Sequence, residues 1–277
     1  MRKSKAHPIV TLAFILTLSG CILIKPTYTK EKIVDSITQL CIKEYSIEPR
    51  VWLHGETVWI YLPLPRLINK DLDWDKENIE KINKVMLSAS RVLLSMKPRP
   101  QFLVSIASDT EEYGIDYISI IWIPDIVKYQ LNFISRDEFG RRYVTRIQQN
   151  PSALSDTTGK HIVKEEITMP DFLAAQIAQR INNKFALDPK NKDYFEVKEV
   201  YGLFNEDTFE IYADIKQVKP LPQGVTLDIQ EEIAKIIAYV IKAYDFKDFL
   251  LVQIKNPSAG ETTSYSRMAL SEFLQKP

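Results

Sequence analysis

The segment Thr208-Phe-Glu-Ile-Tyr-Ala-Asp-Ile215 has the pattern that decides the fold. Its apolar residues alternate with polar or amphipathic ones, which is typical of a β-strand with one buried face and one face in water. A similar β-rich segment, Phe195–Phe204, precedes it, and Asn205-Glu206-Asp207 between the two is a turn signal. We therefore predict a β-hairpin over residues 195–215.

A helix and two more strands are predicted after this hairpin. Asp228-Ile229-Gln230-Glu231 matches a capping box, and isoleucines recur at helical spacing from there to Tyr244. Phe249–Ile254 and Thr262–Arg267 then have strand character, and a short helix over Ala269–Gln275 closes the chain. With a helix that opens at Thr168, the order of this half is α-β-β-α-β-β.

The first half of the chain has the same predicted order. Its helices are Glu31–Tyr45 and Glu77–Met96, and its strands are Val51–Leu53, Thr57–Leu62, Phe102–Ala107 and Ile115–Ile123. Trp59-Ile60-Tyr61 aligns with Glu210-Ile211-Tyr212 at an offset of 151 residues, and Phe102 aligns with Leu250 at an offset of 148. We predict an α+β fold of two tandem α-β-β-α-β-β units, each a mixed or antiparallel sheet with helices packed on one face.

The first 21 residues read as a targeting segment. A head with three basic residues precedes the apolar run Ile9–Leu18, and Leu18-Ser19-Gly20-Cys21 follows. This ending resembles the lipobox of bacterial lipoproteins. The resemblance implies cleavage before Cys21, thioether lipidation of that cysteine, and acylation of the new N-terminus with a fatty acid such as palmitate. The expected location is the cell membrane or the outer membrane, lipid-anchored and facing the periplasm or the exterior, and Ile22 after the cysteine favours the outer membrane.

Two other interpretations of the leader remain open. Pro8–Ile24 would be an uncleaved transmembrane anchor, although about 17 residues are fewer than the roughly 20 that a bilayer core requires. Alternatively, an ordinary signal peptide is cleaved and Cys21 has no special role. On the lipoprotein interpretation, the chain divides into a signal peptide (1–20), a lipidated tether (21–30), the first α+β unit (31–148), a linker (149–165) and the second unit (166–277).

The composition excludes some classes of function. Thirty-six basic and 36 acidic residues cancel, so no net charge attracts nucleic acid. Beyond Cys21 the single cysteine is Cys41, which cannot form an intramolecular disulfide. Eight glycines in 277 residues disfavour a glycine-rich phosphate-binding loop.

The two units differ in their strand patterns. In the first unit, Val58 and Ile60 alternate with Trp59 and Tyr61, so both faces of the sheet are apolar and both need a cover. A helix predicted over Arg136–Gln148, or the second unit, would provide the cover within the chain. A partner protein, a lipid tail or another apolar ligand is the alternative cover. The residues that would bind such an apolar ligand are Trp52, Trp59, Tyr61 and Trp122.

The sequence contains no motif that indicates a particular enzymatic reaction. His54 is expected at a hairpin tip, and His161 has Glu165 and Glu166 nearby but no second histidine or cysteine close in sequence, so we predict neither metal nor cofactor. Acidic groups occur in two places, where they are expected to start a helix and to form a solvated turn. These groups are Asp71, Asp73 and Asp75, and Asp109, Glu111 and Glu112.

A basic run on the predicted helix Arg136–Gln148 is a possible contact with an anionic surface, either lipid headgroups or a cell-wall polymer. Its members are Arg136, Arg141, Arg142 and Arg146. Taken together, the sequence predicts a membrane-anchored envelope lipoprotein that acts as a non-catalytic binding or assembly module, with the membrane and an envelope protein as partners. The alternatives are a carboxylate-dependent hydrolase of envelope material and a periplasmic carrier of an apolar ligand.

Overall fold

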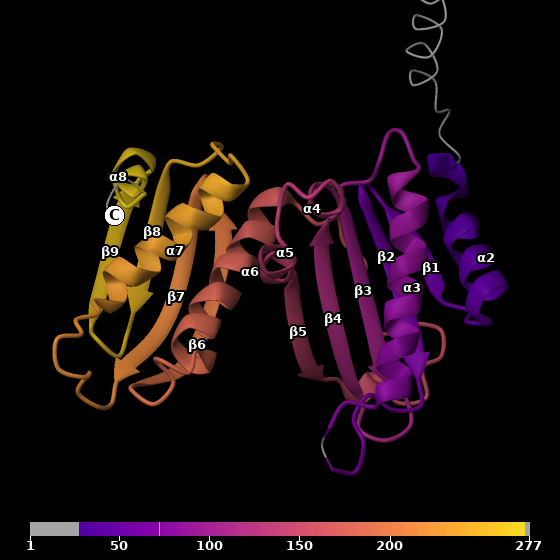
Figure 1. Cartoon of the computed structure of the whole chain (residues 1–277), viewed down its shortest axis with the longest axis horizontal. Coiled ribbons are helices and arrows are strands. Elements are labelled where there is room, and N and C mark those ends of the chain that lie inside the picture. Colours follow the sequence, from indigo (N-terminus) through magenta and orange to yellow (C-terminus); the bar gives the residue numbers. More distant parts are fainter. Residues whose placement is uncertain (1–27, 72, 275–277) are drawn as a thin grey trace, which may run out of the picture.

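A computed structural model describes residues 28–71 and 73–274 of the chain (Figure 1). Two β-sheets lie next to each other along the long axis, each with helices on one face. The predicted α+β fold with two sheet units is therefore confirmed, and both sheets are mixed. Cys21 and the rest of the leader lie outside the described residues.

The first unit contains a five-stranded sheet in the order β1-β2-β3-β4-β5. Strands β2 and β3 are parallel, because α3 crosses over between them, and the other neighbours are antiparallel. The elements are η2 (Lys30–Lys32), α2 (Ile33–Tyr45), β1 (Arg50–His54), β2 (Thr57–Leu64), α3 (Lys76–Leu94), β3 (Phe102–Asp109), β4 (Ile115–Trp122), α4 (Ile123–Gln130), α5 (Arg136–Arg142) and β5 (Val144–Gln149).

The second unit repeats this order and pairing in a four-stranded sheet, β6-β7-β8-β9, with β7 and β8 parallel. After the 3-10 turn η3 (Pro151–Ala153), its elements are α6 (Met169–Asn182), the π-helical turn η4 (Asn183–Leu187), β6 (Phe195–Asn205), β7 (Thr208–Gln217), α7 (Ile229–Ala243), β8 (Leu251–Asn256), β9 (Glu261–Ser266) and α8 (Arg267–Glu272).

The strand register defines which positions of the two units are equivalent. Thr57 pairs with Phe102 in the first unit, and Thr208 pairs with Leu251 in the second. The offset of 151 residues for the hairpins therefore holds. The predicted match of Phe102 with Leu250 is wrong by one residue, because the structural equivalent of Phe102 is Leu251.

Side-chain caps account for where several helices begin. The side chains of Asp228 and Ser135 accept hydrogen bonds from the backbone N–H groups three residues later, at 2.9 and 3.1 Å. Thr168 caps α6 in the same way through Asp171. Each cap satisfies an N–H group that has no partner within its helix, so it fixes the first turn. The capping box predicted at Asp228 therefore marks a helix start, and Ser135 caps α5 in the same way.

The predicted helix Arg136–Gln148 is wrong in its second half. Helix α5 ends at Arg142, and Val144–Gln149 forms the edge strand β5, in which Ile147 pairs with Tyr117 of β4. The β-branched residues Val144, Thr145 and Ile147 favour a strand, and pairing with β4 satisfies their backbone groups in a way that a short isolated helix does not.

The second face of the first sheet is covered from within the chain, mainly by a segment that lies for the most part in the predicted linker (149–165). We call residues 156–167 the strap. Tyr61 donates a hydrogen bond to the backbone oxygen of Asp156, Trp59 Nε1 donates to Glu165 O at 3.1 Å, and Ile167 N donates to Thr57 Oγ1 at 2.9 Å. Ile162 of the strap packs with Trp59 and Tyr61 in one apolar cluster.

The second unit covers the remainder of that face. Phe102 at the start of β3 pairs with Trp122 at the end of β4, and both side chains pack into the core of the second unit. The rings of Phe102 and Phe172 lie 5.4 Å apart, and those of Trp122 and Tyr244 lie 5.3 Å apart. Docking of the second unit was one of the predicted covers. The strap was not, because its polar residues and glycine read as a flexible connection.

Candidate functional site

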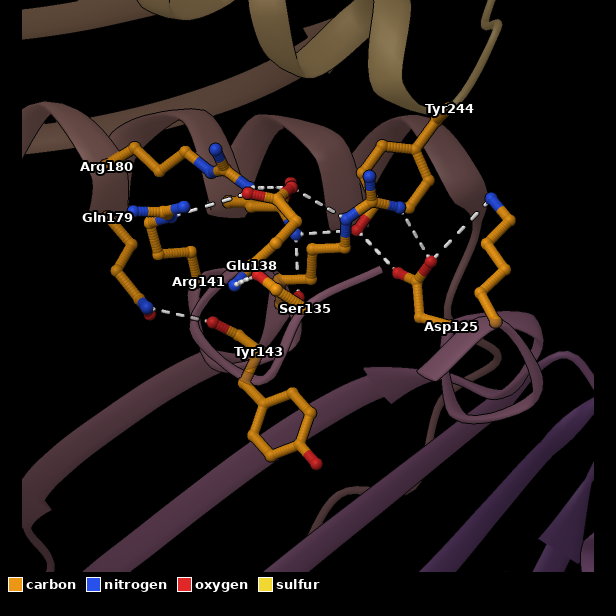
Figure 2. A network of polar contacts seen from close by, with 11 residues as sticks. Asp125, Ser135, Glu138, Arg141, Tyr143, Gln179, Arg180 and Tyr244 are labelled. Atoms are coloured by element: carbon orange, nitrogen blue, oxygen red, sulfur yellow. Dashed lines mark hydrogen bonds and ion pairs between the residues drawn. The ribbon is translucent and has the colours of Figure 1, made fainter. Parts of the chain in front are cut away.

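A cluster of charged side chains lies at the junction of the two units, where α4 and α5 meet α6 and the end of α7 (Figure 2). Arg142 is at its centre. Its Nη1 lies 2.8 Å from Asp125 Oδ1, and its Nε lies 2.8 Å from Glu138 Oε1. Arg142 is 6% exposed and Asp125 is 1% exposed, so these charges are removed from water and depend on one another.

Residues of the second unit complete this cluster. Tyr244 donates a hydrogen bond to Asp125 Oδ2 at 2.8 Å, and Arg180 Nη2 lies 3.4 Å from Glu138 Oε1. The buried Gln176 donates through Nε2 to Arg142 O at 2.6 Å and to the Tyr244 hydroxyl at 2.9 Å. Figure 2 shows Arg180 and Tyr244 pointing toward the carboxylates of Glu138 and Asp125.

The electrostatics of the cluster follow from this pairing. Burial acts to raise the pKa of Glu138, but the guanidinium groups of Arg142 and Arg180 outweigh it and hold that pKa below its ordinary value. Burial, together with the nearby carboxylate of Asp125, raises the pKa of Tyr244 far above its usual range. The cluster therefore holds an ionised Glu138 carboxylate and a neutral Tyr244 phenol, each bonded to another member of the cluster. Its role is to lock the two units together.

Gln179 of α6 extends this lock to the edge of the first sheet. Its Nε2 donates to Tyr143 O at 2.8 Å, and its Oε1 accepts from Thr145 N at 2.6 Å. One amide side chain thus satisfies a carbonyl and an N–H group on the outer edge of the first sheet, which would otherwise face solvent or a further strand. With the shared aromatic core, these contacts make the two units one packed body.

His161 belongs to a second buried polar cluster, under the strap. Its Nδ1 lies 2.7 Å from Asp156 Oδ2, and its Nε2 lies 3.6 Å from Asp116 Oδ1. Asp116 also accepts hydrogen bonds from Ser108 and, at 2.7 Å, from Asn150 Nδ2. The sequence placed Glu165 and Glu166 near His161. The folded chain instead brings Asp116 to it from 45 residues away, for which no local signal exists.

Hydrogen bonds, rather than burial, determine the direction in which the pKa of Asp156 is shifted. Burial acts to raise this pKa. Hydrogen bonds from the backbone N–H and the ring of His161 and from Thr158 outweigh burial, so the pKa lies well below its ordinary value. Nearby, burial raises the pKa of Tyr61 to about 12. These groups hold the strap against the sheet, with Asp156 as a stable carboxylate.

Of the acidic groups noted in the sequence, Asp75 and Asp109 bind backbone N–H groups, whereas the others are exposed. The exposed ones are Asp71, Asp73, Glu111 and Glu112. Asp75 caps α3 through Asn78 N at 3.0 Å and pairs with Arg66 at 2.8 Å. Asp109 was expected in a solvated turn, and this is wrong: it is fully buried. Its carboxylate accepts from Leu67 N at 3.3 Å and Glu112 N at 2.8 Å, which ties two loops together.

The predicted apolar face is occupied by the chain itself. Trp59 is 8% exposed and Tyr61 is fully buried. Trp52 is half-buried beneath Lys164 of the strap, whose Nζ lies 4.5 Å from the ring centroid, and Trp122 is half-buried against Tyr244. These four residues thus line an internal contact surface. Of the two kinds of cover that the sequence left open, the one from within the chain is present at Trp59 and Tyr61, because the strap packs on them.

The predicted basic run does not form one surface. Arg142 is buried in the junction cluster, and Arg141 is exposed but pairs with Glu138 at 3.3 Å. Arg136 and Arg146 are exposed, the first on α5 and the second on β5. Because the predicted helix ends at Arg142, these four side chains do not share a face, and Arg142 cannot contact a headgroup.

An open apolar groove lies on the helix side of the first sheet, between α3 and β4. It has a volume of about 520 Å³. Leu87 and Trp74 on its walls are 54% and 40% exposed. The groove is lined by Trp74, Ile79, Ile82, Asn83, Met86, Leu87, Ser90, Tyr117, Ser119, Ile121 and Tyr143. The sequence signal for it was the pair of apolar faces of β4, of which Tyr117 and Ile121 belong to this side.

Comparisons with known proteins add no assignment: no family model, no curated protein and no solved structure matches the chain. Within residues 28–71 and 73–274, no helix is long and apolar enough to span a membrane. Over the same part of the chain, no group of three or more His, Cys, Asp or Glu side chains is arranged to hold a metal ion.

Proposed function

We propose that this chain is a lipid-anchored lipoprotein of the cell envelope that acts as a non-catalytic binding or assembly module. The observation that carries the proposal is Leu18-Ser19-Gly20-Cys21 behind a basic head and an apolar run, which resembles a lipobox in both content and position. Acylation of Cys21 would hold the first unit next to the membrane.

The distribution of polar groups supports a binding role rather than a catalytic one. The acidic groups at the junction and under the strap are paired with arginine, histidine or backbone partners, and Asp109 is enclosed by backbone N–H groups. A carboxylate hydrolase needs two carboxyl groups that flank a substrate-sized space. No pair of this kind lines the groove beside α3, whose walls are apolar and aromatic.

The groove beside α3 is the surface to which we assign a partner protein. Its wall is a row of α3 residues at helical spacing, Ile79, Met86 and Leu87 among them, and its floor is the strand β4. An apolar groove of this form accepts an apolar helix or strand from another protein. Carriage of an apolar ligand on the other face has less support, because the strap covers it.

Mass spectrometry of the membrane fraction tests the anchor. We expect a chain that begins at Cys21 and carries the added mass of acyl groups, and we expect Cys21→Ala to abolish both the processing and the added mass. A chain that retains Met1 in the membrane fraction, or an unmodified Cys21, would contradict lipidation.

Site-specific photocrosslinking in intact cells tests the binding surface. A photoreactive amino acid at Leu87, which is 54% exposed in the groove, is expected to give a discrete crosslinked product. Leu187 is a matched control, since it is 62% exposed and lies at the end of η4 in the second unit. Equal crosslinking at the two positions, or none at Leu87, would count against a partner in the groove.

A further inference from the structure

The described chain begins at one particular end of the first unit. Lys30 forms an ion pair with Glu56 at the tip of the β1–β2 hairpin. Gln101 N donates to Glu56 O at 2.7 Å, and Ile123 N donates to Gln101 O at 2.8 Å, so the start of β3 and the start of α4 lie at the same end. We call this the anchor end. It is the upper end of the molecule in Figure 1.

The second unit presents its corresponding end in the same direction. The ring contact between Trp122 and Tyr244 places the end of α7 beside the start of α4. Leu250 N donates to Asp207 O at 2.8 Å, which places the start of β8 beside the tip of the β6–β7 hairpin. Figure 1 shows α4, α8 and the first turn of α2 all toward this end.

Exposed apolar side chains gather at this end. Among the described residues, six large hydrophobic side chains are at least 59% exposed, and four of them follow α4 or flank the start of β8 and α8. These four are Leu131 at 59%, Phe133 at 75%, Leu250 at 72% and Met268 at 78%. The other two are Val163 in the strap and Leu187, which lies at the end of η4, near the start of β6 and away from this end. If this end of the molecule met an apolar surface, these side chains would leave water, which is favourable.

The short segment between Cys21 and Tyr28 limits how far a membrane that holds Cys21 can lie from this end of the molecule. Seven peptide units separate Cys21 from Tyr28, which limits their distance to about 25 Å when extended. We propose that the anchor end of both units lies on the bilayer, with Leu131, Phe133, Leu250 and Met268 inserted into the interface beside the lipid on Cys21. This rests on the proposed lipid anchor.

The charges of the anchor end indicate what kind of membrane contact to expect. Lys97, Lys247 and Arg267 are exposed there, and so are Asp207, Asp245 and Asp248, and Lys247 pairs with Asp245 at 3.0 Å. Because exposed groups of both signs are present at this end, attraction to anionic headgroups is not the driving force. Burial of the apolar side chains by about 5–10 Å, the usual depth of interfacial insertion, is the contribution that holds this end down.

Depth-dependent fluorescence quenching on the full acylated chain tests the orientation. A single cysteine carrying an environment-sensitive dye is placed at Phe133, Met268 or Leu187 in separate variants, since Cys41 is buried and resists labelling. Each variant is incorporated into vesicles of phosphatidylethanolamine and phosphatidylglycerol that contain spin-labelled lipid. Circular dichroism of each variant checks the fold, and these exposed positions are expected to tolerate the dye.

We expect quenching at Phe133 and Met268 to exceed that at Leu187 by about threefold or more, because only the first two reach the interface. Vesicles of phosphatidylcholine alone are expected to give the same pattern, since apolar insertion does not require anionic lipid. Equal quenching at all three positions, or quenching confined to Leu187, would overturn the proposed orientation.

The mass of the same preparation separates this inference from the proposed anchor. An acylated chain without quenching at Phe133 overturns the orientation and leaves the anchor standing. A chain without acyl mass that is still quenched at Phe133 overturns the anchor and supports the membrane-facing end. A chain that lacks both overturns the two together.

Discussion

The two units have the same connectivity and use the faces of their sheets differently. In the first unit, consecutive residues of β2 from Thr57 to Leu62 are all buried, because α3 covers one face and the strap covers the other. In the second unit, β7 alternates: Phe209 and Ile211 are buried, whereas Glu210 and Tyr212 are half-exposed. The same topology is therefore compatible with a sheet that is buried on one face or on both. Whether polar residues alternate with apolar ones along the strands determines how many faces are buried.

Equivalent tyrosines show this difference most directly. Tyr61 pairs with Ile106 of β3 and is fully buried, while Tyr212 pairs with Lys255 of β8 and stacks on Tyr201 at the surface. The two positions have the same residue type and the same place in the sheet. Their environments differ because only the first unit has a strap.

The largest difference between the units is expected for alanine at these two tyrosines. Tyr61→Ala should lower the free energy of unfolding by about 4 kcal/mol, because it removes a buried ring and leaves a cavity under the strap. Tyr212→Ala should cost about 1 kcal/mol or less, since the ring is half-exposed. Urea denaturation measures both, and similar losses would show that the strap does not create a second core.

The next largest effect is expected at the junction. Arg142→Ala should cost about 3 kcal/mol, because it leaves the carboxylates of Asp125 and Glu138 buried without their shared cation. Lys255→Ala is the matched variant in the second unit. It should cost at most about 1 kcal/mol, because its ion pair with Glu210 at 3.4 Å is open to solvent. Denaturation midpoints compare the two, and a small loss for Arg142→Ala would contradict a locking role.

A smaller effect, with a defined pH dependence, is expected at the strap. The pKa of Asp156 is lower in the folded chain than its ordinary value of 3.8, so its carboxylate contributes stability above pH 4 that is lost as the pH falls below it. Asp156→Asn should cost about 2 kcal/mol at neutral pH, because a charged acceptor of several N–H groups is lost.

Unfolding at a series of pH values checks this prediction. The Asp156→Asn variant should lose less stability than the natural chain between neutral pH and pH 2. Asp188→Asn serves as the control, because that carboxylate accepts from Lys190 N in an exposed turn of the second unit. If both variants lose as much stability between neutral pH and pH 2 as the natural chain does, Asp156 does not hold the strap.

The smallest difference is expected between two glycines with left-handed backbone. Gly159 in the strap has φ +73°, and Gly224 before α7 has φ +81°. Alanine at either position should cost about 1 kcal/mol for the backbone conformation. Gly159→Ala should cost about 1 kcal/mol more, because its Cβ would lie 2.9 Å from the ring of Trp52 and 3.0 Å from that of Tyr61. Thermal unfolding of both variants measures the difference.

Much of the fold was predictable because its signals are local. The capping residues Ser135 and Asp228 lie within three residues of the N–H groups that they satisfy, and the strand alternation around Ile211 has a period of two. The end of α5 was not predictable in this way. The spacing of Phe139, Tyr143 and Ile147 fits a helix, and only the pairing of β5 with β4 converts its last part into a strand.

Most contacts in the candidate sites could not be predicted from the sequence, for a related reason. Arg142 was identified as a basic residue, but its partner Asp125 lies 17 positions away, and Tyr244, which also bonds to Asp125, lies 119 positions from it. The apolar residues of the first sheet were correctly identified as needing a cover. Which segment provides it depends on where the chain passes after β5, and no local pattern specifies that path.

The sequence by itself determined the two α-β-β-α-β-β units, the starts of their helices and the surplus of apolar side chains on the first sheet. These depend on period, capping and residue type, which act over a few positions. The tertiary structure decided that residues 156–167 become a strap, that Arg142 becomes a buried lock, and that the anchor end exposes Phe133 and Met268. These outcomes depend on contacts between distant residues, and such contacts form only when the two sheets pack together.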